Sequence, residues 1–255
     1  MAFARAKIKE LEKGLYLIDD AGESTCYLVC GRERAALIDT ANGREDLKAI
    51  VRSLTDLPLT VVNTHGHVDH VLGNVYFDGA YIHPEDMPLA EGVFARGRAE
   101  MEAHGLKPCL VHPLQIGETI DLGGETLEVV SLRGHTPGSI GLLDRRRRVI
   151  FSGDGLNPHL WMQLPHSLPI RELREMLLKL KRDFGGGFDR VLNGHADDYR
   201  SADVVDHLIR ACDEMLAGQR QEDKPYICTW MPGDFLQHPV GDIPGECIVY
   251  TIDKL

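Results

Sequence analysis

The sequence predicts an α/β fold in which two sheets are covered by helices. Short apolar stretches bounded by glycine or charged residues recur along the chain, and amphipathic helical stretches separate groups of them. Polar clusters directly follow several of the apolar stretches. The order of strands, helix, strands, helix, strand and helix suits a layered fold. Because 255 residues can bury a large core, we expect one domain over residues 1–255.

The first quarter of the chain contains strand signals and one helix signal. Residues 15–19, 25–30 and 35–39 are rich in β-branched, aromatic and aliphatic side chains, and glycine-containing or charged turns separate them. Apolar residues then recur at helical spacing over 42–54. The short apolar run 59–64 predicts a strand that leads directly into a histidine-rich loop.

The middle of the chain adds a helical segment and two hairpins. A further strand is expected at 80–83, whereas residues 84–112 show no strand alternation and predict a helical insertion that serves as a lid or a dimer contact. Residues 118–132 predict a hairpin that turns at two glycines. Residues 140–154 predict a second hairpin whose turn holds four arginines, at 145–148, which we interpret as a solvated turn and not a nucleic-acid patch.

The last third predicts two helices and two strands. Residues 170–184 are amphipathic and end at three glycines, and 190–195 is a strand followed by a loop. A second helix is expected over 201–216 with Ser201 as its N-cap. Residues 247–252 predict a final strand.

The composition narrows the classes of partner. A net charge of −11 disfavours nucleic acid, so a small-molecule substrate is expected. The six cysteines form no CxxC pair and predict reduced thiols. No signal sequence or run long enough to cross a bilayer is recognised, so we expect a cytoplasmic protein with no membrane contact. A homodimer is the one protein partner considered.

One cluster carries metal chemistry. His65, His67, Asp69 and His70 lie within six residues, in H-x-H-x-D-H. Imidazole and carboxylate groups are standard zinc ligands. Four such groups at this spacing cannot easily serve one ion, but they could serve two adjacent ions with help from elsewhere in the chain.

Three further places supply candidate ligands. His135, Asp154 and His195 each stand beside glycine at the end of an apolar strand, where a sharp turn could direct the side chain into a shared pocket. Each signal is weak alone, since a lone Gly-His or a lone aspartate after a strand usually has a structural role. All of them in this order, after H-x-H-x-D-H, point to a metal site.

The order THGHVDH, GHTPGS, SGDG and NGH resembles the metallo-β-lactamase superfamily, in particular glyoxalase II-like hydrolases and lactonases. The resemblance implies a four-layer αββα sandwich with two mixed sheets and helices on the outer faces. It also implies two divalent ions, with zinc expected and iron or manganese also compatible. The implied ligands are His65, His67 and His135 for one ion, Asp69, His70 and His195 for the other, and Asp154 as the bridge.

The resemblance implies a hydrolase that uses a metal-bridging hydroxide. By the same resemblance Asp154 would bridge the ions, and Asp69 would orient the nucleophile while it binds a metal. An alanine at His67 or Asp154 is therefore expected to remove metal and activity together. Asp39, at the end of a strand, either orients a ligand histidine or is a turn residue.

The substrate pocket is less well defined by the sequence. Candidate pocket residues are His159, Trp161 and His166, shortly after Asp154, and Tyr199, for which simple packing is the competing interpretation.

Departures from particular branches of the superfamily favour a small ester, thioester or lactone as substrate. One group of β-lactamases has cysteine where Asp154 stands. The tail 226–255 is nearly free of Lys and Arg, unlike the glutathione-binding end of glyoxalase II. The alternatives are a non-haem iron sulfur dioxygenase, which needs only one metal, and a phosphodiesterase, which the acidic charge disfavours.

Overall fold

Seven N-terminal strands form the first sheet in chain order. The computed structural model describes residues 6–103 and 105–255. Strands β1 to β4 pair antiparallel, and β4 to β7 pair parallel. The strands are β1 (Ala6–Glu12), β2 (Leu15–Asp20), β3 (Ser24–Cys30), β4 (Ala35–Ile38), β5 (Leu59–Val62), β6 (Gly79–Ile82) and β7 (Leu110–Pro113).

The second sheet has six strands in the order β14-β13-β11-β10-β9-β8. Its β8–β9 and β10–β11 pairs are the two predicted hairpins, β9 pairs antiparallel with β10, and β11 pairs parallel with β13. The strands are β8 (Thr119–Asp121), β9 (Thr126–Ser131), β10 (Ile140–Asp144), β11 (Val149–Gly153), β13 (Arg190–Asn193) and β14 (Arg200–Ser201).

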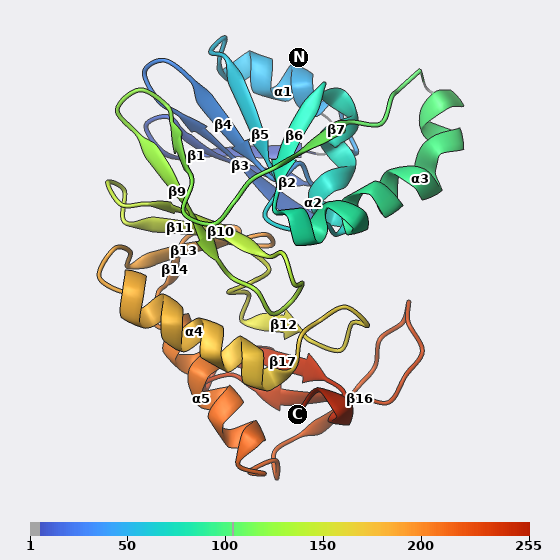
Figure 1. The fold of residues 1–255 in the computed structure, drawn as a ribbon, viewed down its shortest axis with the longest axis vertical. Helices are drawn as coiled ribbons and strands as arrows, with labels where there is room; N and C mark the ends of the chain where they lie inside the picture. The colour runs from blue at the N-terminus through green and yellow to red at the C-terminus, as the bar shows by residue number, and fades with distance from the viewer. Residues whose placement is uncertain (1–5, 104) are drawn as a thin grey trace.

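Helices cover the outer faces of both sheets (Figure 1). On the first sheet lie α1 (Leu47–Leu54), α2 (Val68–Val71) and α3 (Met87–Ala103), the last preceded by η2 (Pro84–Asp86). On the second lie α4 (Ile170–Phe184) and α5 (Val204–Leu216). Helix α5 begins later than predicted: Asp203 is its N-cap, and Ser201 lies in β14, where its Oγ accepts the Asp203 N–H.

Three buried clusters fill the three spaces between these layers. Alternate residues of β3 face opposite sides: Cys26 and Leu28 pack toward α1, and Tyr27 and Val29 pack toward the second sheet. A third cluster joins the second sheet to α4 and α5. Both faces of β3 are therefore buried, which explains why its residues 26–30 are all apolar. The predicted αββα arrangement is confirmed.

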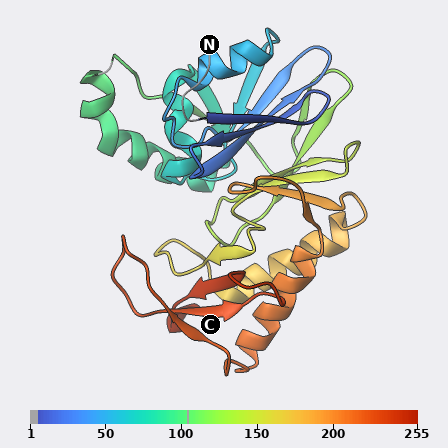
Figure 2. The ribbon, with the colours of Figure 1, turned by 180° about the vertical axis from the view of Figure 1, so that it is seen from behind.

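A third sheet was not predicted. It has the order β12-β17-β16-β15 and lies beside α4 and α5, at the C-terminal end of the molecule (Figure 2). Its strands are β12 (His159–Trp161), β15 (Lys224–Tyr226), β16 (Phe235–Pro239) and β17 (Cys247–Tyr250). Three of them are too short or too polar to give a strand signal. In the part of the chain that the structure describes, no helix has the length and hydrophobicity to cross a membrane.

The arginine run after β10 is neutralised by acidic side chains. Arg147 is the most enclosed of the four, with a side chain 10% exposed, and its Nε lies 2.8 Å from Glu125 Oε2. Asp144 has no exposed surface. Its burial, together with the neighbouring Glu125 carboxyl, raises the pKa of Asp144 to about 6, although hydrogen bonding to the Arg147 backbone lowers it.

This raised pKa predicts a pH-dependent stability. The pKa of Asp144 is higher in the folded state than in the unfolded state, so the folded state binds a proton more tightly at this group. The stability that this proton contributes is lost as pH rises from about 4 through 6. Asp144→Asn removes the effect. The unfolding free energy of the variant minus that of wild type should be about 1 kcal/mol larger at pH 8 than at pH 5, as measured by urea denaturation. An Asp121→Asn control should show no such change, and an equal difference at both pH values would contradict the prediction.

Candidate metal centre

The seven candidate ligands converge on one edge of the sandwich. His65 and His67 follow β5, and Asp69 and His70 lie on α2, which begins directly after His67. The other three follow strands of the second sheet: His135 comes after β9, Asp154 after β11 and His195 after β13. Ends of strands from both sheets therefore meet at a single site.

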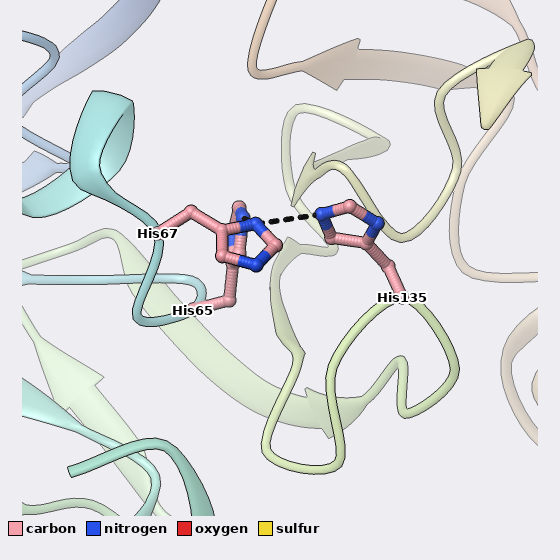
Figure 3. A group of neighbouring side chains, drawn as sticks. All are labelled: His65, His67 and His135. Carbon is pink, nitrogen blue, oxygen red and sulfur yellow. Dashed lines mark hydrogen bonds between the residues drawn. The ribbon is translucent and has the colours of Figure 1, made fainter. Parts of the chain in front are cut away.

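Three histidines form the first group. His65 Nε2 lies 3.0 Å from His67 Nδ1, and His135 Nε2 lies 2.8 Å from the same nitrogen. Figure 3 shows His65 and His67 on one loop facing His135 on another. Tetrahedral ligands at ~2.0–2.1 Å from zinc stand ~3.3 Å apart, so a spacing of this order suits three nitrogens that share one ion.

Asp69, His70 and His195 form the second group. Asp69 Oδ2 lies 3.6 Å from His70 Nε2 and 3.6 Å from His195 Nε2. Their possible ligand atoms lie within 4.8 Å of one another, as do those of the first group. His195 and Asp69 are partly open to solvent, whereas His70 is fully buried.

Asp154 lies between the two groups and faces both. Its Oδ2 is 3.5 Å from His135 Nε2, and its Oδ1 is 3.2 Å from His195 Nε2 and 3.7 Å from His70 Nε2. Within the described residues, His70 Nε2 and Asp154 Oδ1 are buried without a hydrogen-bond partner. Such orphaned groups are costly unless something satisfies them, and divalent ions would do so. The donor set therefore fits a pair of metal ions.

In four of the five histidines, a hydrogen-bond contact of Nδ1, the ring nitrogen that points away from the site, fixes the orientation of the ring. This contact leaves Nε2 facing the site. His67 is the exception, since its Nδ1 faces inward and its Nε2 lies 2.5 Å from His166 Nε2. The other Nδ1 contacts are His65 to Thr64 Oγ1 at 3.1 Å, His70 to Asp39 Oδ2 at 2.9 Å, His135 to the Trp161 carbonyl at 2.7 Å and His195 to the Glu23 carbonyl at 2.9 Å.

Asp39 organises two of these contacts. Its Oδ1 accepts the Thr64 N–H at 2.7 Å, and its Oδ2 accepts the Thr64 hydroxyl at 2.7 Å and faces His70. The residue adopts φ +60°, which is uncommon outside glycine and signals a constrained position. Of the two interpretations of Asp39, the structure supports the one in which it orients a candidate ligand.

Electrostatics divides the histidines into two kinds. Burial, with the neighbouring histidines, holds the pKa of His65 and of His67 well below the usual range, so both rings are neutral and able to bind metal. Burial also lowers the pKa of His70, but the carboxylates of Asp69, Asp39 and Asp154 outweigh it and raise the value to about 10. A metal ion at the second group must therefore displace a proton from His70.

Two glycines allow the loops to approach this closely. Gly153 has φ +48°, and a Cβ there would stand 2.1 Å from Thr64 Oγ1. A Cβ at Gly194 would stand 2.3 Å from His70 Cε1. Any side chain at either position would push a candidate ligand or its support out of place, so the glycines beside these ligands serve close packing as well as turning.

Asp86 is a supporting residue that the sequence did not identify. It is 1% exposed, and its carboxylate accepts the N–H groups of Gly66 and Gly138 and the Thr136 hydroxyl, at 2.7–2.8 Å. It thereby joins the loop of His65 and His67 to the loop of His135. Its only sequence signal is an aspartate before a helix, which normally indicates a cap.

A cavity of about 900 Å³ opens onto the two groups. His159, Trp161 and His166 line it, as does α3 through Leu89 and Val93. Tyr199 does not, which corrects its assignment to the pocket. Its ring lies 4.4 Å beneath the Arg190 guanidinium, against the core between the sheets. The lining residues without a sequence signal include three from the C-terminal tail, Tyr226, Trp230 and Met231.

Fold and site together define a metallo-β-lactamase-type sandwich, and sequence comparison agrees. Residues 19–204 match the family model described as "Metallo-beta-lactamase superfamily". The chain belongs to this superfamily.

Curated relatives have hydrolase names. The human "Acyl-coenzyme A thioesterase MBLAC2" is 31% identical over 182 residues, which cover 57% of this chain and 64% of that protein. "Hydroxyacylglutathione hydrolase GloC" of Haemophilus influenzae is 33% identical over 150 residues, covering 53% of this chain and 68% of that protein. The chain thus spans less than two thirds of the length of the thioesterase.

Solved structures agree on the fold. The "Metallo-beta-lactamase from Pontibacter korlensis" superposes with a TM-score of 0.61 at 16% identity, covering 82% of this chain and 99% of that one. At such low identity the likeness shows the fold alone.

Proposed function

We propose that this protein is a dinuclear metal-dependent hydrolase of small esters, thioesters or lactones, and that thioesters are its main substrates. The observation that carries the proposal is the position of Asp154. One of its oxygens faces His135 of the first group, and the other faces His70 and His195 of the second. A carboxylate placed in this way suits a bridge between two ions.

The chain's residues define what would be bound. The first ion would lie among His65, His67 and His135, and the second among Asp69, His70 and His195. When bound, two divalent ions lower the pKa of water and polarise a carbonyl group. Imidazole and carboxylate donors suit zinc, iron and manganese alike, and zinc is our first choice.

The reaction consumes one water for each bond broken. Water adds to the acyl carbon, the carbon–sulfur bond breaks, and a carboxylate, a thiol and one proton leave the site. Asp69 is 31% exposed and opens onto the cavity, so its carboxylate can orient the attacking water and accept its proton.

The names of the relatives and the cavity support this choice over its alternatives. An acyl-coenzyme A thioesterase and a hydroxyacylglutathione hydrolase are among the similar proteins. A sulfur dioxygenase needs only one metal, whereas two candidate groups are present. A phosphodiester is less suited to a cavity whose walls are mainly apolar and which, among its described lining residues, has Arg96 as its one Lys or Arg side chain.

Metal removal tests the proposal directly. Protein purified without chelator or added metal should contain about two ions per chain by elemental analysis. Dialysis against dipicolinate should abolish hydrolysis of a simple thioester, and readdition of zinc or manganese should restore it.

A surface histidine provides the matched control. His112→Ala, which removes an exposed ring packed against Tyr81 on the edge strand β7 and outside the cavity lining, should keep the metal and the activity. Undiminished hydrolysis by metal-depleted protein would overturn the proposal. One iron per chain, with no second ion on reconstitution, would redirect the assignment to the oxygenase.

A further inference from the structure

The cavity has a second end that the metal chemistry does not use. Four residues of the C-terminal sheet and its loop form this end, which we call the aromatic subsite: Trp161 on β12, Tyr226 on β15, and Trp230 and Met231 on the loop that joins β15 to β16. Figures 1 and 2 show this loop and α3 projecting from the same side of the molecule. Both line the cavity.

The aromatic subsite is a preformed wall. The Trp161 and Trp230 rings lie 5.2 Å apart between centroids and are inclined by 38°. Trp161, Tyr226 and Met231 pack against a buried cluster of Phe235, Cys247 and Val249. Since this backing is buried, the wall needs little rearrangement before it can bind an apolar group.

The polar side-chain atoms of Tyr226 and Trp161 are paired or buried. The Tyr226 hydroxyl lies 3.2 Å from His159 Nε2, and His159 Nδ1 lies 3.0 Å from the Gly245 carbonyl. Trp161 Nε1 is buried, without a hydrogen-bond partner among the described residues. None of the four subsite residues carries a charge, so the wall presents ring faces and a thioether.

Exposure supports a binding role for Trp230. Its side chain remains 57% exposed, although it stacks on Trp161 at the mouth of the cavity. Exposed aromatic rings that meet a cavity are typical of ligand-binding surfaces. Ile227, on the same loop, is 86% exposed and does not line the cavity, so it supplies an internal comparison.

We infer that the aromatic subsite binds a neutral, apolar acyl group and thereby selects substrates with acyl chains longer than acetyl. This inference rests on the proposed function and makes Trp161 and Trp230 its specificity-determining residues. Coulombic recognition is not available there, so an acyl chain that ends in a carboxylate should be rejected.

The two tryptophans of the chain, Trp161 and Trp230, both lie in the subsite, so intrinsic fluorescence reports on it alone. The metal-loaded protein is titrated with 2-octanone, an uncharged and non-hydrolysable methyl ketone whose chain is one carbon shorter than that of an octanoyl group, and with acetone. We expect a saturable fluorescence change with 2-octanone and none with acetone. Trp230→Ala should weaken 2-octanone binding at least about tenfold, as detected through Trp161, and Ile227→Ala should leave it unchanged.

Hydrolysis gives the second readout. Acetyl, octanoyl and succinyl thioesters of N-acetylcysteamine share one leaving group and differ only in the acyl part. Wild type should favour octanoyl over acetyl by at least about tenfold in kcat/KM, with succinyl the poorest, and Trp230→Ala should reduce the octanoyl preference by about fivefold or more, mainly through KM.

The fluorescence titration and the hydrolysis assay test the subsite and the proposed function separately. Equal responses to 2-octanone and acetone, or an unchanged octanoyl preference in Trp230→Ala, would overturn the subsite. Failure of wild type to hydrolyse any thioester would contradict the proposed function instead, and the fluorescence titration would still decide whether the subsite binds apolar groups.

Discussion

Asp154→Asn should lower thioester hydrolysis by at least about 10³-fold and reduce the bound metal from about two ions per chain to one or fewer. The amide keeps the volume of the side chain but replaces one of the two oxygens, which face His135 on one side and His70 and His195 on the other. Stabilisation of the transition state by two ions amounts to several kcal/mol, and each 1.36 kcal/mol corresponds to about tenfold in rate.

The fold should survive this change. Asp154 lies after β11, outside the three core clusters, so Asp154→Asn removes no core packing. Circular dichroism should match wild type, and Asp189→Asn, which removes an exposed carboxylate beside β13 of the same sheet, should retain both ions and activity. A variant at Asp154 with two ions and full activity would show that the carboxylate does not bridge.

The seven candidate ligands could be predicted because their signal is local. H-x-H-x-D-H concentrates four donors in one loop, and each remaining donor stands beside a glycine after a strand. The structure brings these donors together as expected from the rule that loops at strand ends carry functional groups. A supporting residue such as Asp86, which joins two ligand loops, could not be predicted, because its partners Gly66 and Gly138 lie 20 and 52 residues away in sequence.

The layers of the fold were predictable for a similar reason, and the C-terminal sheet was not. Helices α1, α4 and α5 have strong amphipathic periodicity, and the hairpins β8–β9 and β10–β11 have clear turn residues. By contrast, β15 is three residues long and contains a proline, and β12 is three residues long. Their identity as strands comes from pairing with β16 and β17, which no local pattern records. Of the four residues of the aromatic subsite, the sequence therefore indicated Trp161 alone.

Asp39→Asn should weaken metal binding and activity by about 10- to 100-fold, because residues that orient metal ligands typically contribute effects of that size. The Asp39 carboxylate faces three donors: the N–H and hydroxyl of Thr64, and Nδ1 of His70. An asparagine offers one oxygen and an NH₂ group, so at least one of these three donors would face the NH₂ group, which is itself a donor. Asparagine tolerates φ +60°, so the backbone should be preserved and the effect confined to hydrogen bonding.

Competition with a chelator gives the metal affinity, and excess metal distinguishes orientation from damage to the fold. If Asp39 acts by holding His70, saturating metal should restore most of the activity of Asp39→Asn, because the ligand itself is still present. Asp20→Asn is the matched control, since Asp20 is also a buried aspartate of the first sheet, 6% exposed, and it accepts the Arg44 N–H instead of facing a histidine. Wild-type affinity in Asp39→Asn would mean that Thr64 and the helix α2 alone fix His70, and that the constrained backbone at Asp39 serves the turn after β4 only.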